Sequence, residues 1–261
     1  METLSTLGFD SRVVKYWMRF QAHRRGCQLH CGPYAWDLKK DSRVIRISRR
    51  QFASVGHLAD QFDGLFKTLE ASKAGSQTLL DFSRVHTHKY RVPGLTFELA
   101  QWPEPDASIE AYFEWYKPSP TDLVFDLGAE CGVATCVLSH LTGSVVAFEP
   151  DANMRVILER NVARHKLTNV LLAKRSAASL AGLISVFGQP AFCRINLDQV
   201  APEFLQNDAR SWTSRPILLS AHSQSSNVRK RFNAFLNANG FETASNHLLG
   251  ITWARPPGVT C

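Results

Sequence analysis

The sequence predicts an α/β fold of the Rossmann-like type, in which helices cover a mostly parallel sheet. Two short apolar runs, 123–125 and 145–148, are typical of strands buried on both faces. A helical pattern of apolar residues follows the first run, after a turn bounded by Gly128 and Gly132. In such sheets ligands bind outside the carboxyl ends of the strands, so this turn marks the expected site.

Two acidic residues stand at the ends of these strands. Asp126 closes the first strand and Glu149 follows the second, where an acid commonly holds ribose hydroxyls. The spacing Gly128-x-x-x-Gly132 differs from the G-x-G-x-x-G that cradles a pyrophosphate, and a carboxylate at Asp126 would repel that group. A cationic nucleoside that bears an amino acid suits this turn. S-adenosylmethionine (SAM), with its sulfonium and its ammonium, is the ligand that fits.

Two segments resemble motifs I and II of class I SAM-dependent methyltransferases. They are Phe125-Asp-Leu-Gly-Ala-Glu-Cys-Gly-Val-Ala-Thr135 and Val145-Val-Ala-Phe-Glu-Pro150. The chain is most similar to the FkbM-type family, over roughly residues 90–255 and more weakly over 40–90. The resemblance implies a seven-stranded, mostly parallel sheet whose last strand is antiparallel. It also implies O-methylation of sugars and other hydroxylated metabolites, with SAM as cofactor.

The resemblance also implies which residues contact the cofactor. The methionyl part would lie against the turn after the first strand, the ribose against the acid of motif II, and the adenine at the end of the third strand. The corresponding residues are Asp126, Gly128, Ala129, Glu130, Gly132 and Thr135 for the methionyl part, Glu149 and Pro150 for the ribose, and Ser176 and Ala177 for the adenine. The acid or amide that often precedes this alanine in the family is absent here.

The fourth strand departs from the family. FkbM-type proteins usually carry Lys-Ile-Asp-Val-Glu-Gly, and this chain has Arg194-Ile-Asn-Leu-Asp-Gln199. Asn196 can hydrogen-bond to substrate or to the methionyl ammonium but cannot take a proton. Either Asp198 takes over the missing carboxylate or the site has lost its catalytic acid. His222 ends the fifth strand and is a candidate general base for a hydroxyl, the alternative being a histidine hydrogen-bonded in a loop.

The remaining elements follow from local signals. After a strand at Leu95–Leu99 and a helix over 109–116, the core strands are expected at 123–126, 145–149, 169–172, 191–198 and 216–221, with a final pair at 241–244 and 248–254. Asp151 is expected to cap the helix after the second strand. Residues 184–187 are expected to form an added strand, a feature of FkbM-type sequences.

Residues 1–89 are expected to form a basic extension of helices and a short strand, and residues 90–261 the methyltransferase domain. The first 50 residues hold eleven Lys and Arg against four Asp and Glu, whereas the rest is balanced. Val13, Val14, Trp17 and Phe20 predict one helix, residues 43–48 a strand, and residues 51–72 another helix. The basic segment could follow phosphates of nucleic acid, lipid or nucleotide-sugars, or be a solvated helix face.

Composition supports a globular protein of the cytoplasm. The 261 residues are 44% hydrophobic and 20% charged, and no apolar run approaches the ~18 residues of a membrane span. Residues 1–10 lack the pattern of a signal peptide, so the six cysteines are expected to be reduced. His23, Cys27, His30 and Cys31 match no strong zinc pattern, and no metal is expected.

Three functions are compatible with these observations. The preferred one is a SAM-dependent methyltransferase that modifies a hydroxyl on a sugar, natural product or other small metabolite. Asn196 motivates the second, a degenerate methyltransferase fold that acts as a binding protein or scaffold. The third is a nucleic-acid methyltransferase that uses the basic segment. Against it, the fourth strand lacks both the Asn/Asp-Pro-Pro-Tyr/Phe segment and the Pro-Cys nucleophile that such enzymes commonly use.

Overall fold

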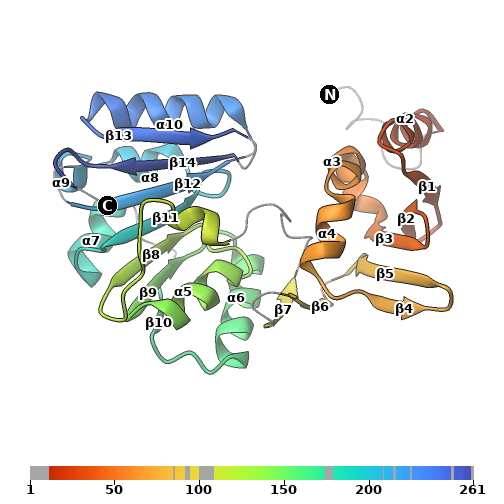
Figure 1. Ribbon diagram of the computed structural model, residues 1–261, viewed down its shortest axis with the longest axis horizontal. Coiled ribbons are helices and arrows are strands. Elements are labelled where there is room, and N and C mark those ends of the chain that lie inside the picture. Colours follow the sequence, from red (N-terminus) through yellow and green to blue (C-terminus); the bar gives the residue numbers. More distant parts are fainter. Residues whose placement is uncertain are drawn as a thin grey trace. The chain divides into compact units, whose positions relative to one another are not determined.

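A computed structural model describes residues 12–84, 86–91, 95–99, 109–173, 179–207, 209–213, 216–223, 225–247 and 250–259. The chain divides into two compact units, Met1–Asp106 (unit 1) and Ala107–Cys261 (unit 2), which are described separately (Figure 1). The boundary at 89/90 drawn from the sequence stays a prediction.

Unit 1 is built on a five-stranded sheet of order β1-β2-β3-β5-β4. The strands of this sheet are β1 (Gln28–Cys31), β2 (Ala35–Lys40), β3 (Arg43–Ser48), β4 (Ser72–Ala74) and β5 (Gln77–Phe82). A separate antiparallel pair is formed by β6 (His86–Lys89) and β7 (Thr96–Leu99). Its helices are α2 (Arg12–His23), η1 (Arg49–Ser54), α3 (Val55–Asp60) and α4 (Phe62–Thr68). The expected strand at 43–48 is confirmed as β3. Its buried face contains Ile45 and Ile47, and the buried face of the neighbouring β2 contains Trp36 and Leu38.

The single helix expected over 51–72 is wrong. The segment forms η1, α3 and α4, and then turns into β4. Gln51, with φ −90° and ψ 15°, and Gln61, with φ −88° and ψ 0°, interrupt the helical geometry. The apolar residues keep their helical spacing across these breaks, which is why the sequence pattern reads as continuous.

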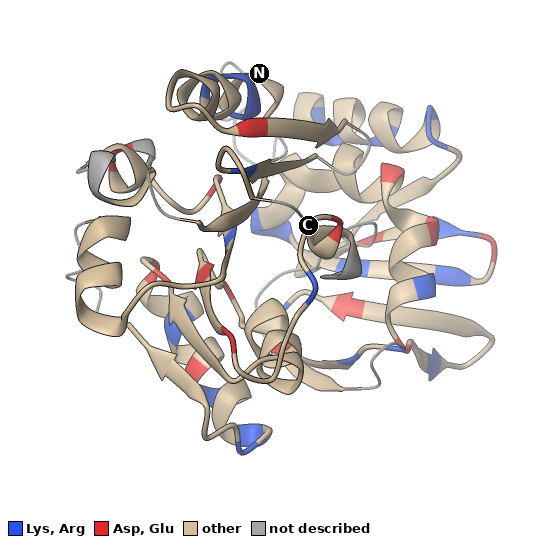
Figure 2. Ribbon diagram, turned by 60° about the vertical axis from the view of Figure 1, so that its left-hand side comes forward, with Lys and Arg blue, Asp and Glu red and all other residues tan. Residues whose placement is uncertain are grey.

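Several cations of the basic segment have acidic partners within unit 1. Arg25 pairs with Asp60 at 2.7 Å, Lys40 with Asp63 at 2.6 Å, and Arg46 with Asp37 at 2.8 Å. Figure 2 marks the charged residues along the ribbon. These three cations therefore form ion pairs with acids of the same unit. Helix α2, in contrast, contains no Asp or Glu.

Unit 2 contains a seven-stranded sheet of order β10-β9-β8-β11-β12-β14-β13. The strands are β8 (Leu123–Leu127), β9 (Ser144–Phe148), β10 (Val170–Leu172), β11 (Phe192–Asn196), β12 (Leu218–His222), β13 (Glu242–Asn246) and β14 (Ile251–Arg255). The strands from β10 to β12 pair in parallel, and β14 runs antiparallel to both β12 and β13. This confirms the predicted Rossmann-like sheet of the class I methyltransferase type, with an antiparallel last strand.

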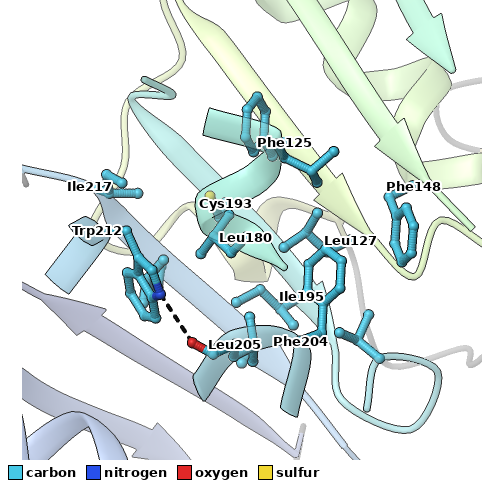
Figure 3. Packing of buried hydrophobic residues seen from close by; sticks show 14 of the residues in the cluster. Phe125, Leu127, Phe148, Leu180, Cys193, Ile195, Phe204, Leu205, Trp212 and Ile217 are labelled. Carbon is cyan, nitrogen blue, oxygen red and sulfur yellow. Dashed lines mark hydrogen bonds between the residues drawn. The ribbon is translucent and has the colours of Figure 1, made fainter. Parts of the chain in front are cut away.

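Helices cover both faces of this sheet (Figure 1). One face packs on α7 (Leu180–Phe187), α8 (Pro202–Gln206), α9 (Arg210–Thr213) and α10 (Ser226–Ala238). Figure 3 shows this core, in which the Trp212 indole donates to the Leu205 carbonyl at 3.0 Å. The other face packs on η2 (Ile109–Phe113), α5 (Val133–Leu141) and α6 (Ala152–Arg164). The predicted strand residues face these two cores alternately.

The strand expected at 184–187 is wrong, because these residues form the last turn of α7. Ser179 caps this helix by accepting a hydrogen bond from the Gly182 amide at 3.1 Å. Leu180, Leu183 and Ile184 are buried at helical spacing. A short apolar run fits a strand or a helix equally well. The helix expected over 109–116 is the shorter 3₁₀ helix η2.

The N-cap of α6 provides a test of the local sequence signals. The Asp151 carboxylate accepts hydrogen bonds from the amides of Asn153 and Met154 at 2.8 and 2.9 Å. We expect Asp151→Ala to lower the free energy of unfolding by about 0.5–2 kcal/mol in chemical denaturation, because these amides lose their acceptor. Asn153→Ala, in the same exposed turn, serves as the control. Equal stability of the two variants would contradict the capping role.

Candidate functional site

The candidate site lies at the carboxyl ends of β8, β9, β11 and β12. Asp126 lies on β8, Glu149 directly follows β9, and Asn196 and His222 are the last residues of β11 and β12. These strands are neighbours in the sheet, so residues far apart in sequence meet along one edge. Open α/β sheets bind ligands at this edge.

The glycines of the turn after β8 are required by the conformation and by close packing inside the protein. Gly128 has φ 76° and Gly132 has φ 82°, values that favour glycine. A Cβ on Gly128 would lie 3.0 Å from the Cβ atoms of Asn196 and Gln199, and one on Gly132 would overlap Leu158. The groups closest to these two glycines are therefore protein side chains.

Asp126 forms a buried ion pair with Arg194. The carboxylate is 0% exposed and accepts from Arg194 Nη1 at 2.8 Å and from Thr135 Oγ1 at 2.5 Å. Arg194 also donates to the Gly128 carbonyl at 3.3 Å, and its guanidinium lies 5.0 Å from the Tyr112 ring centre. Burial alone would lower the pKa of Arg194, but Asp126 outweighs it and holds this pKa above its usual value. The negative charge of Asp126 is thus matched within the protein.

Glu149 is buried, and backbone amides hold its carboxylate. It is 1% exposed, and its two oxygens accept from the Glu130 amide at 2.6 Å and the Asp151 amide at 2.7 Å. Burial raises the pKa of Glu149 to about 7, while the two amide hydrogen bonds act in the opposite direction. A carboxylate has about four acceptor positions, so each oxygen keeps one position beyond its amide bond.

The other predicted cofactor residues belong to the same turn or lie outside the described part. The Gly128 and Ala129 amides both donate to the Phe148 carbonyl, at 2.8 and 3.1 Å, which ties the turn to β9. Glu130 has a positive φ of 49° and its side chain lies 3.5 Å from Gln199 Nε2. Pro150 follows Glu149 in the loop before α6. Ser176 and Ala177 lie outside the described residues.

A four-residue polar patch lies on β11 and β12. Arg194 is level with Ser220 in the parallel register, and Asn196 is level with His222. All four are buried, and their alternate positions place them on the same face of the sheet. Within the described part of the chain, Arg194 Nε and Ser220 Oγ have no hydrogen-bond partner. Buried polar atoms are rarely left without one, so a polar group of a ligand or a water fits here.

Asp198 is not part of this patch. Strand β11 ends at Asn196, so Asp198 lies in the following turn and is exposed. Its Oδ1 accepts from Ser223 Oγ at 2.6 Å, and its amide donates to Asn196 Oδ1 at 3.1 Å. These bonds hold the turn and fix the orientation of the Asn196 side chain. Sequence reasoning missed Ser220, whose signal was a polar position alternating with apolar ones in a buried strand.

The remaining expectations concern metals and membranes. Among the described residues, no group of three His, Cys, Asp or Glu side chains is placed to hold a metal ion. Burial raises the pKa values of Cys27 and Cys31 above their usual range. In the same part of the chain, every helix is too short or too polar to cross a bilayer.

Comparison with models of protein families and with curated proteins gives no match. Among solved structures, the chain is similar to precorrin-6y C5,15-methyltransferase from Geobacter metallireducens GS-15 (14% identity, 56% of this chain and 84% of that chain, TM-score 0.46). It is also similar to an rRNA methylase from Streptococcus thermophilus (13%, 57% and 93%, 0.43) and to a SAM dependent methyltransferase from Aquifex aeolicus (15%, 56% and 87%, 0.43). These likenesses are too distant to indicate a substrate.

The buried ion pair predicts a large cost when one partner is removed. We expect Arg194→Met to lower the free energy of unfolding by about 3–5 kcal/mol, because Asp126 is left charged and unpaired in the interior. The exposed pair of Arg255 with Glu242 provides the control, and Arg255→Met should cost about 1 kcal/mol or less. Asp126→Asn added to Arg194→Met should recover most of the loss. Similar costs for the two single variants in chemical denaturation would contradict the buried pair.

The raised pKa of Glu149 predicts that the stability of the protein depends on pH. Folding raises its pKa from 4.5 to about 7, so between these values the native state binds more protons than the unfolded state. The contribution of this group is therefore greatest below pH 4.5 and falls as the pH rises to about 7, by at most about 3 kcal/mol. Glu149→Gln should remove this slope from unfolding free energies measured across the range, and the exposed control Glu159→Gln should keep it. An unchanged slope in Glu149→Gln would contradict the raised pKa.

Proposed function

We propose that unit 2 binds SAM at the carboxyl edge of its sheet and transfers the methyl group to a hydroxyl of a sugar or another small metabolite. One observation carries the proposal: the amide-held carboxylate of Glu149 stands beside the glycine turn after β8. A buried carboxylate with two unused acceptor positions suits a pair of ribose hydroxyls. The strand order of unit 2 supports the same assignment.

The polar patch supplies groups for the acceptor. When bound, SAM provides an electrophilic methyl group. The Asn196 amide would hydrogen-bond to the acceptor and orient its hydroxyl, and His222 would take the hydroxyl proton. Arg194 Nε and Ser220 Oγ, which have no hydrogen-bond partner within the described part of the patch, would bind a second oxygen of the acceptor. Because methyl transfer needs an in-line approach, positioning by these groups supplies most of the catalysis.

The acceptor group at Arg194 and Ser220 is expected to be uncharged. Asp126 already balances the Arg194 guanidinium at 2.8 Å, so a carboxylate or phosphate there would add an unmatched buried charge. A second hydroxyl avoids this cost. Polyols such as sugars offer neighbouring hydroxyls, which favours them over anionic acceptors.

A second candidate function is a methyltransferase fold that binds ligand without turnover. The Asp126–Arg194 pair favours it, because the acid of motif I cannot offer its charge to a cationic cofactor. Asn196, which stands where the family has an acid, favours it too. The two candidates share the cofactor site and differ in catalysis.

The shared cofactor site is tested by isothermal titration calorimetry with SAM. We expect binding by the wild type and at least about tenfold weaker binding by Glu149→Ala, a loss of ~1.4 kcal/mol or more, because the ribose acceptor is removed. Glu159→Ala, an exposed position on α6, is the matched control. Absence of binding by the wild type would contradict both candidates.

Turnover is tested by methyl transfer from labelled SAM to a panel of sugars and polyols. If the site is active, His222→Gln should lower the rate by about 10²–10⁴-fold without weakening SAM binding, because the proton acceptor is lost. Asn196→Asp should also lower it. An inactive wild type that gains activity through Asn196→Asp would instead identify the fold as one that binds without turnover.

A further inference from the structure

Helix α2 of unit 1 carries apolar side chains on two opposite sides. The inner side packs into unit 1 with Val14, Met18 and Ala22. The outer side exposes four residues, called here the outer stripe: Val13 (59% exposed), Tyr16 (74%), Trp17 (39%) and Phe20 (41%). Their spacing of three, four and seven residues places them in one line along the helix. Four exposed apolar side chains in one line indicate an interaction surface.

Cations border the outer stripe. At 100° per residue, Arg12, Lys15 and Arg19 lie between the stripe and the buried side of the helix. Arg24 follows α2 and lies 5.8 Å from the centre of the Phe20 ring. The helix contains no acidic residue, so a partner with negative charge would complement this surface.

We propose that the outer stripe of α2 docks unit 1 on the surface of an anionic lipid bilayer. An apolar stripe with Trp, Tyr and Phe, bordered by Lys and Arg, is the pattern of a helix that lies in the plane of the interface. The rings enter the boundary between headgroups and acyl chains, and the long cationic side chains reach the lipid phosphates. This inference is independent of the chemistry proposed for unit 2.

Ring geometry disfavours RNA as the partner. Base stacking needs free ring faces, but Trp17 and Phe20 contact each other with centres 5.6 Å apart, and Arg24 covers Phe20. Val13 offers no ring. A second copy of the chain is disfavoured by charge, because a symmetric contact between two α2 helices would add the cations of both helices to one interface, and neither helix contains an acid to pair with them.

The proposal is tested by co-sedimentation of the full chain with vesicles of phosphatidylcholine alone or mixed with phosphatidylglycerol. We expect binding to the mixed vesicles only, weakened by added salt. The triple variant Tyr16→Ser, Trp17→Ser, Phe20→Ser should lose at least about tenfold in binding. Tyr34→Ser, which removes an 89% exposed aromatic ring between β1 and β2, should bind like the wild type. Arg12→Gln with Arg24→Gln should reduce binding and its salt dependence.

Four outcomes would overturn the proposal. The first is that the wild type binds neither kind of vesicle, and the second is that it binds both kinds equally. The third is that Tyr34→Ser loses as much binding as the triple variant, and the fourth is that the triple variant loses none. In parallel, a labelled oligonucleotide and light scattering identify the alternatives. Oligonucleotide binding or dimers that the triple variant abolishes, without vesicle binding, would assign the stripe to RNA or to a second copy. Circular dichroism verifies that the variants fold. If the triple variant does not fold, the comparison of wild-type binding to the two kinds of vesicle still tests the proposal.

Discussion

The buried ion pair between Asp126 and Arg194 is the interaction on which the site of unit 2 depends. It joins the two central strands β8 and β11, and Thr135 of α5 adds a third contact to the same carboxylate. Through the Gly128 carbonyl, Arg194 also holds the glycine turn. Burial of a carboxylate is costly unless it is paired or hydrogen-bonded, and Arg194 and Thr135 supply both kinds of partner for Asp126.

Two acids of the edge therefore have different roles. Asp126 forms an ion pair with Arg194 within the sheet, whereas backbone amides hold Glu149 and burial raises its pKa to about 7. The charge of Glu149 therefore varies near neutral pH. Recognition of a nucleoside at this edge would rest on hydrogen bonds to Glu149 more than on attraction between opposite charges.

Much of this fold could be predicted from local sequence signals, whereas the contacts between residues distant in the sequence could not. Strands β8 and β9, the glycine turn and the Asp151 cap are each encoded within a few residues, and the structure places them as expected. The partner of Asp126 lies 68 residues away, and the partners of Glu149 are backbone amides that no residue type reveals. In unit 1, β1, β2, β4 and β5 have at most two buried positions each, so their sequences carry little strand pattern. Residues 184–187 fit two periodicities, so their pattern did not decide between a strand and a helix.

The proposed SAM site at the carboxyl edge is tested most directly by hydrogen–deuterium exchange of the full chain with and without SAM. Glu149 and the glycine turn lie together at the carboxyl edge, tied by amide hydrogen bonds whose exchange reports on binding. SAM is expected to slow exchange in peptides that cover 126–135 and 148–155, while the sheet of unit 1 is unchanged. Slower exchange only elsewhere in the chain, or none at saturating SAM, would contradict a cofactor site at this edge.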